Sequence, residues 1–141
     1  EMSVRSFEDV SIGETFGPEV VAVGRDTLVA YANASGDQNP IHQDEAFAKG
    51  DGLPDVIAHG MWTMGASSSV VARWVGDAGR VLEFGTRFTK PVVVPTQGNE
   101  ISVTGVVKSV DAERRRATVD VTTTCGDDKV LGRCIAVVQL A

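Results

Sequence analysis

The sequence contains only two cysteines, only two histidines and fewer basic than acidic residues among its 141 positions. Cys125 and Cys134 have neither the spacing of metal ligands nor that of a disulfide framework, so we expect two reduced thiols in a cytoplasmic protein. A net charge of −6 argues against general nucleic-acid binding, which depends on a basic surface.

Long hydrophobic runs and targeting signals are also missing. The longest uncharged stretch that a helix could use, residues 56–72, is short and rich in serine, glycine and threonine, so we expect no membrane span. The first residues, EMSVRSFEDVSIGE, lack the basic start and apolar run of a signal peptide. No internal repeat or linker is visible, so we expect a single domain over residues 1–141, large enough for a hydrophobic core.

The first half of the chain contains two amphipathic or capped helical patterns. Asp26 is the expected N-cap of a helix over residues 26–35, whose apolar face includes Val29. Asp44 is expected to cap a short helix over residues 45–48. The segment between these helices is dense in turn-forming residues, so we expect an irregular loop there.

Residues 60–72 form the most unusual segment, because they carry no charge and show no polar face. A helix that is apolar or small on all sides is normally surrounded by protein. We therefore expect a buried helix here, ended by Gly76. Its serines, at positions 67–69, are expected to donate hydrogen bonds to carbonyl groups one turn back.

The rest of the chain has β patterns. Val119 and Val121 alternate with polar neighbours, as in a sheet with one face in water. The connections 111–115 and 125–128 are short and polar, which favours antiparallel hairpins. We predict an α+β protein in which an antiparallel sheet of about five strands curls around one apolar helix. The expected strands cover residues 14–24, 81–94, 100–109, 116–124 and 129–140.

Both histidines lie in the irregular region beside the predicted buried helix. His42 follows Asp37 by five residues in the run GDQNPIH, where Pro40 restricts its own backbone and that of Asn39. Asn39 can bond the backbone of its neighbours and so stiffen the loop. Such a loop can present Asp37 and His42 to one water molecule. A pocket with few waters would then raise the pKa of Asp37 toward neutrality, where a carboxyl group carries protons well.

Two other interpretations of this loop remain open. Asp37 and Asn39 could be ordinary turn residues, with His42 on the surface. A metal site could use Asp37, His42 and Asp44, but no ligand spacing typical of metal sites supports it, and we expect no metal.

Gly60 directly precedes the predicted buried helix. A helix N-terminus offers unpaired N–H groups and a partial positive charge, and a residue without a side chain lets a ligand oxygen approach. These features suit an oxyanion hole for the oxygen of a thioester. Alternatively, Gly60 is a glycine needed for packing. For His59 the sequence favours a structural role as a buried and satisfied histidine. Arg87 and Lys90 could meet a phosphate at the mouth of a pocket.

The run YANASGDQNPIHQDEAFAKG, followed by VIAHGMWTMG, resembles the signature of the MaoC-like (R)-specific hydratase/dehydratase family. The segments RWVGDAGRVLEFGTRFTKPVVVP and GVVKSVD…GRCIAVVQLA resemble the B subunit of the mycobacterial-type fatty acid synthase II 3-hydroxyacyl-ACP dehydratase. The resemblance covers nearly the whole chain. It implies a hot-dog fold, in which a curved antiparallel sheet wraps a long central helix, and a dimer with pockets at the subunit boundary.

The same resemblance assigns roles to individual residues. The catalytic aspartate and histidine of the family fall on Asp37 and His42, and its oxyanion-hole glycine falls on Gly60. A pocket serine falls on Ser68 and the asparagine of the motif on Asn39. Trp62 departs from the family pattern, which has a smaller aliphatic residue there, and it could shorten the tunnel for the acyl chain if it faces the pocket.

The expected reaction is the reversible hydration of a trans-2-enoyl thioester to the (R)-3-hydroxyacyl thioester, without a metal or redox cofactor. The acyl group would be carried by CoA or by acyl carrier protein, and the partner subunit would be a second copy or a related hot-dog chain. Two alternatives remain: a hot-dog acyl thioesterase, and the catalytic half of a heterodimeric dehydratase that is inactive without its partner. The sequence does not decide the acyl chain length, or which of Asp37 and His42 is the base toward water.

Overall fold

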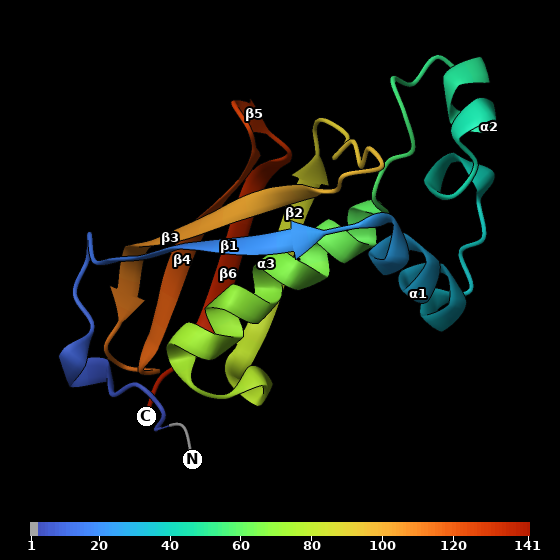
Figure 1. Ribbon diagram of the computed structural model, residues 1–141. Helices are drawn as coiled ribbons and strands as arrows, with labels where there is room; N and C mark the ends of the chain where they lie inside the picture. Colours follow the sequence, from blue (N-terminus) through green and yellow to red (C-terminus); the bar gives the residue numbers. More distant parts are fainter. Residues whose placement is uncertain (1–2) are drawn as a thin grey trace.

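The computed structural model describes residues 3–141. An antiparallel six-stranded sheet has the order β1-β3-β4-β6-β2, with β5 paired to β4, and α3 lies across one of its faces (Figure 1). This arrangement confirms the predicted α+β class. The strands are β1 (Thr15–Val23), β2 (Val81–Phe88), β3 (Asn99–Asp111), β4 (Arg116–Cys125), β5 (Asp128–Lys129) and β6 (Leu131–Gln139). The helices are α1 (Arg25–Ser35), α2 (Glu45–Gly50) and α3 (Gly60–Val75), with 3-10 turns at Phe7–Asp9, Pro40–His42 and Ala78–Arg80.

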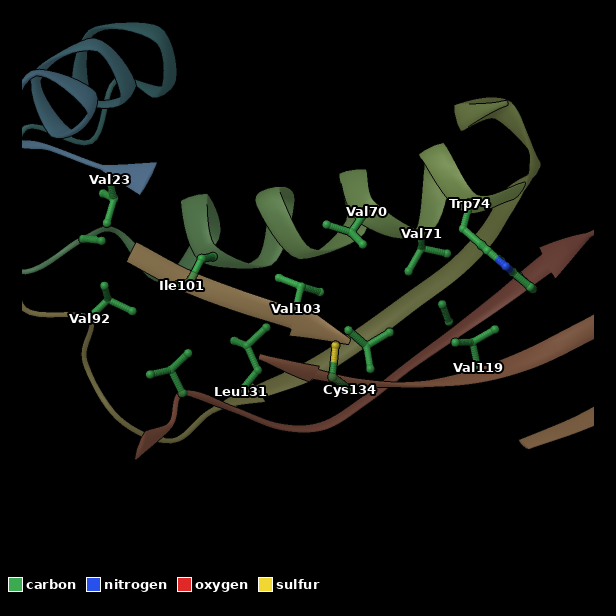
Figure 2. Packing of buried hydrophobic residues seen from close by; sticks show 14 of the residues in the cluster. Val23, Val70, Val71, Trp74, Val92, Ile101, Val103, Val119, Leu131 and Cys134 are labelled. Atoms are coloured by element: carbon green, nitrogen blue, oxygen red, sulfur yellow. The ribbon is translucent and has the colours of Figure 1, made fainter. Parts of the chain in front are cut away.

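The core lies between α3 and the sheet. From Ile101 to Val107 on β3 and from Ala117 to Thr123 on β4 every second residue is buried, because successive side chains of a strand point to opposite faces. Figure 2 shows Val70, Val71 and Trp74 of α3 directed toward strand residues such as Val103 and Val119. Burial of these side chains is the main force that holds the helix on the sheet.

Small polar residues let α3 approach the central strands closely. The Ser67 hydroxyl lies 2.8 Å from the Thr63 carbonyl oxygen and 2.7 Å from the hydroxyl of Thr123 on β4. Ser69 donates to the carbonyl of Gly65 at 3.0 Å, so the predicted bonds one turn back are confirmed for these two serines. The first half of α3 therefore buries polar side chains, and the Ser67 and Thr123 hydroxyl groups are hydrogen-bonded to each other.

The opposite side of α3 is not covered within the chain. Met61 is 57% exposed, and Gly65 and Ser69 are also exposed. The prediction of a helix surrounded by protein is thus wrong for the single chain, because one sheet can cover only one side of it. The outer side of α3, which is uncharged from Met61 to Ser69, is available for contact with another subunit.

Two predicted strands have different limits. The strand expected over 81–94 ends at Phe88, because residues 92–94 leave the sheet and pair with the segment that precedes α3. In this pairing the N–H of Ala58 donates to the carbonyl of Val92 and the N–H of Val94 to the carbonyl of Val56, each at 2.8 Å. The strand expected over 129–140 is divided at Val130, whose N–H donates to the Thr123 carbonyl at 3.0 Å. The two predicted hairpin connections are confirmed.

Helix α1 begins one residue before the predicted N-cap. Gly24 is the N-cap, and the Thr27 hydroxyl accepts a hydrogen bond from its N–H at 3.1 Å, so Asp26 lies inside the first turn. Val29 is 45% exposed, because the helix is turned to bury Leu28 and Ala32. Helices α1 and α2 lie beyond the end of the sheet, near the start of α3 (Figure 1). No helix within residues 3–141 is long and apolar enough to cross a membrane.

Candidate active site

The loop between α1 and α2 is shaped by its own polar side chains. Asp37 Oδ1 accepts a hydrogen bond from the Asn39 N–H at 3.1 Å. Asn39 Oδ1 in turn accepts from the Ile41 N–H at 3.2 Å and caps the 3-10 turn that carries His42. Asn39, predicted to bind substrate, is therefore already used to fold the loop, although the residue remains exposed.

This loop brings Asp37 and His42 together. The Asp37 Oδ2 and His42 Nε2 atoms are 3.9 Å apart. His42 Nδ1 lies 2.7 Å from the carbonyl oxygen of Ile57, which can only accept, so Nδ1 carries the hydrogen and donates it. The neutral imidazole consequently presents the lone pair of Nε2 toward the carboxylate.

The environment keeps His42 uncharged near neutral pH. Burial is the largest effect and lowers the pKa of His42 below its ordinary value of 6.5, and the neighbouring His59 lowers it further. The bond to Ile57 and the charge of Asp37 act in the opposite direction without reversing the shift. The Asp37 side chain is 52% exposed, so the single chain does not form the water-poor pocket that the sequence led us to expect around this carboxyl group.

His59 is the residue whose place in the site the sequence did not indicate. Its ring is buried and stacks on the His42 ring, with 3.7 Å between centroids and 23° between planes. His59 Nε2 lies 3.1 Å from the backbone carbonyl oxygen of Asp37 and donates to it. Its Nδ1 is buried without a hydrogen-bond partner among the described residues, so His59 is only half satisfied. The signals in the sequence were that His59 lies beside the predicted buried helix and directly precedes Gly60.

Asp37, His42 and His59 each have one potential metal-ligand atom within 4.8 Å of the others. Each histidine already uses one ring nitrogen on a backbone carbonyl. Because the rings are stacked, the lone pairs of their other nitrogens lie in two separate, nearly parallel planes, which does not suit coordination of one ion by both. Asp44, the third ligand considered from the sequence, caps α2 instead by accepting from the Phe47 N–H. The arrangement therefore favours proton transfer over metal binding.

Gly60 opens α3 immediately after His59. In the part of the chain that the structure describes, nothing accepts a hydrogen bond from its N–H, as expected for the first turn of a helix. A Cβ atom at this position would lie 3.1 Å from ring carbons of Phe88 on β2. Ser68 follows Gly60 by two helical turns, on the same half-buried side of α3. Both interpretations of Gly60, as a packing glycine and as an oxyanion donor, are therefore compatible with its surroundings.

The remaining predicted residues lie around this end of α3. Arg87 is exposed beside Phe88, and Lys90 is exposed with its Nζ 3.2 Å from Asp128 Oδ1. Trp62 is half-buried and packs against the hydrophobic core. The structure thus brings Asp37 and His42 together and places Gly60 next to His59, which contacts both of them. Trp62, in contrast, is partly occupied by core contacts.

The lowered pKa of His42 predicts how stability depends on pH. The unfolded chain protonates this histidine near pH 6.5, whereas the folded chain does so only at lower pH. The contribution of His42 to the free energy of unfolding is therefore complete above pH 6.5 and is lost as the pH falls below it. The slope should be at most about 1.4 kcal/mol per pH unit for one proton.

Urea denaturation of the wild type and of His42→Asn between pH 5 and 8 measures this contribution, because the asparagine amide can still donate to Ile57. We expect the wild type to lose stability relative to His42→Asn as the pH decreases. Parallel pH profiles for the two proteins would contradict a buried, neutral His42.

Residues 8–129 match the family model described as MaoC like domain. A 3-hydroxybutyryl-CoA dehydratase of Methylorubrum extorquens is 34% identical over 134 residues, which are 93% of this chain and 82% of that protein. The Fatty acid synthase beta subunit TOXC of Cochliobolus carbonum is 38% identical over 99 residues, which are 69% of this chain but only 5% of that protein. A solved structure titled MaoC-like dehydratase superposes with a TM-score of 0.96 at 38% identity, over 99% of this chain and 43% of that one.

The chain therefore corresponds to less than half of two of these relatives and to most of the third. The family model covers most of the chain, and the superposition covers almost all of it. The resemblance inferred from the sequence is thereby confirmed, together with the hot-dog fold: this chain belongs to the MaoC-like dehydratase family.

Proposed function

We propose that this protein is a hydro-lyase that interconverts trans-2-enoyl and (R)-3-hydroxyacyl thioesters. The observation that carries the proposal is the pairing of His42 Nε2 with Asp37 Oδ2 at 3.9 Å, in a histidine whose Nδ1 is held by Ile57. Membership of the MaoC-like family, and a relative named 3-hydroxybutyryl-CoA dehydratase, support this reaction class. The (R) configuration rests on the resemblance of the GDQNPIH and AHGM motifs to (R)-specific hydratases.

In the proposed hydration, one water molecule forms hydrogen bonds of about 2.8 Å to both His42 Nε2 and Asp37 Oδ2. The 3.9 Å between these two atoms allows one water to bind both. His42 takes a proton from the water as its oxygen forms a bond to C3 of the substrate. The electrons of the C2–C3 double bond shift toward the thioester, and its oxygen gains negative charge. The pair then returns a proton to C2 on the same face, so that water is added and both residues regain their starting states.

The Gly60 N–H is the proposed donor to the thioester oxygen. It has no partner within the described chain, and the dipole of α3 adds a partial positive charge at this end. Donors of this kind act most strongly on the charge that develops in the transition state. Ser68 and Asn39 are the further groups proposed to contact the substrate.

The acyl group is proposed to be attached to CoA or to acyl carrier protein, both of which carry phosphate. Arg87 and Lys90 are exposed near Phe88 and could contact that phosphate, although Asp128 already pairs with Lys90. No metal or redox cofactor is needed for this chemistry.

We propose that the working protein is a dimer, either of this chain or with a related hot-dog subunit. One chain leaves half of the Asp37 side chain and the outer side of α3 exposed. Strand β2 ends the sheet and carries the exposed apolar side chains of Leu82 and Phe88. We treat residues 1–141 as one domain, because the buried residues form one core cluster.

The cytoplasm is the proposed location. Cys125 and Cys134 are both free, and burial raises the pKa of each thiol, so neither is activated for disulfide exchange. Unpaired thiols of this kind suit a reducing compartment.

The first experiment follows the loss of enoyl absorbance when the purified chain acts on enoyl-CoA substrates, with free thiol measured in parallel. We expect absorbance to fall without thiol release, and Asp37→Asn and His42→Asn to lower the rate by about 100-fold or more, because each removes a proton carrier. Unchanged melting temperatures would show that both variants remain folded.

The other outcomes separate the alternatives. Thiol release would identify an acyl thioesterase and reject the hydratase. No reaction with CoA substrates, but activity after addition of a related subunit or with acyl carrier protein substrates, would identify the catalytic half of a heterodimer or a strict carrier requirement. A folded Asp37→Asn variant with a normal rate would remove Asp37 from the mechanism.

A second prediction distinguishes the two roles of Gly60. Gly60→Ala places a methyl group against Phe88 and beside the N–H, and we expect a loss of kcat of about 10-fold or more from the blocked donor. Phe88→Ala removes the ring that the added methyl group would meet. If Gly60 is the donor, the double variant Gly60→Ala/Phe88→Ala should still have a lower kcat than Phe88→Ala alone.

Gly50→Ala is the control, because Gly50 also lies in a helix (α2), has no neighbour within 4 Å of the added Cβ and lies away from the side of α3 proposed to meet the partner subunit. It should retain normal activity. If the double variant has the same kcat as Phe88→Ala alone, Gly60 is needed only for packing.

A third prediction concerns the acyl chain. If Trp62 narrows the tunnel, the wild type should prefer short enoyl-CoA substrates, and Trp62→Leu should shift the kcat/KM profile toward longer chains. A variant that loses stability with an unchanged chain-length profile would show that Trp62 contributes only to the core.

A further inference from the structure

His59 is buried, but its ring contacts the site and not the aliphatic core. One face stacks on His42, the ring of Tyr31 lies 4.7 Å away, and Nε2 donates to the Asp37 carbonyl. Nδ1 has no partner within the described residues, although buried polar groups are nearly always paired. Burial of an unpaired Nδ1 is unfavourable, and His59 contacts both proposed catalytic residues. These two facts indicate a role other than packing.

The position of His59 in the chain gives that explanation. It is the N-cap of α3, so its backbone is joined directly to Gly60, the proposed oxyanion donor. Its side chain reaches back to the loop and binds the backbone of Asp37 at 3.1 Å. One residue therefore connects the donor for the thioester oxygen with the groups that hold the water.

We propose that His59 is a positioning residue that fixes the distance between the Gly60 N–H and the Asp37–His42 pair. Its hydrogen bond to Asp37 fixes the distance of the Asp37–His42 loop from the start of α3. Its ring packs against one face of the His42 ring. The inference rests on the proposed hydratase function. Hydration requires water to reach C3 while the thioester oxygen lies on Gly60, so the separation of these two points determines whether both interactions occur together.

The geometry also assigns hydrogen positions that can be measured. His42 donates through Nδ1 to Ile57, and His59 donates through Nε2 to Asp37, so in their neutral forms the two rings are opposite tautomers. Because the chain contains only these two histidines, nitrogen NMR of the imidazole groups can observe both without overlap. The titratable groups placed against the stacked pair are Asp37 and Tyr31.

The kinetic test compares three variants of the full chain. His59→Gln keeps an N–H donor at the position of Nε2, His59→Phe keeps the stacked ring without a donor, and His59→Ala removes both. We expect His59→Phe and His59→Ala to lose about 10- to 100-fold in kcat with KM changed much less, as misplacement of reacting groups does. His59→Gln should recover most of this loss, and the melting temperatures of the Gln and Phe variants should be similar.

Three results would overturn the proposal. They are normal kcat in His59→Phe, a loss in His59→Gln as large as in His59→Phe, or losses that only follow the fraction of unfolded protein. NMR of the wild type provides a measurement that needs neither variants nor activity: a His59 ring with a hydrogen on Nδ1 and none on Nε2 would show that it does not donate to Asp37. If the wild type hydrates no substrate, the proposed function fails, while the NMR result still decides whether His59 holds the loop.

Discussion

The site depends on the hydrogen bond from His42 Nδ1 to the carbonyl of Ile57. This bond decides which ring nitrogen is free, and it does so through a backbone group that cannot move independently. Ile57 belongs to the segment that pairs on one side with Ile41 and on the other with residues 92–94. The same segment continues into α3, whose burial on the sheet fixes its direction. The packing of α3 on the sheet therefore fixes the position of the Ile57 carbonyl, and through it the orientation of the His42 ring.

The sequence was informative wherever short-range chemistry decides the structure. Gly76 adopts the left-handed conformation that ends α3, and Asp44 caps α2, as the residue types predicted. The closeness of Asp37 and His42 also follows from a short, stiff loop between them. In contrast, Asp26 was a wrong N-cap, because Thr27 supplies a competing hydroxyl group at the right distance from Gly24.

What the sequence could not provide were contacts between distant segments. The apolar run at 92–94 has the composition of a strand, and only the course of the chain after Phe88 makes it the partner of residues 56–58. His59 is similar, because its stacking on His42 joins two loops that no local pattern connects. The apolar character of α3 was correctly linked to burial, but a single sequence does not show whether the second side is covered by the same chain or by another.

The lowered pKa of His42 has opposite effects on the two halves of the proposed reaction. It makes His42 a weaker base toward water, but it makes the protonated ring a stronger acid toward carbon, which is the poorer proton acceptor. The stacked His59 contributes to this balance, since a second ring close by disfavours a charge on the first. Asp37 opposes it by stabilising the cation. A buried base between a carboxylate and a second imidazole can therefore hold a proton briefly and release it in either direction, as a reversible hydration requires.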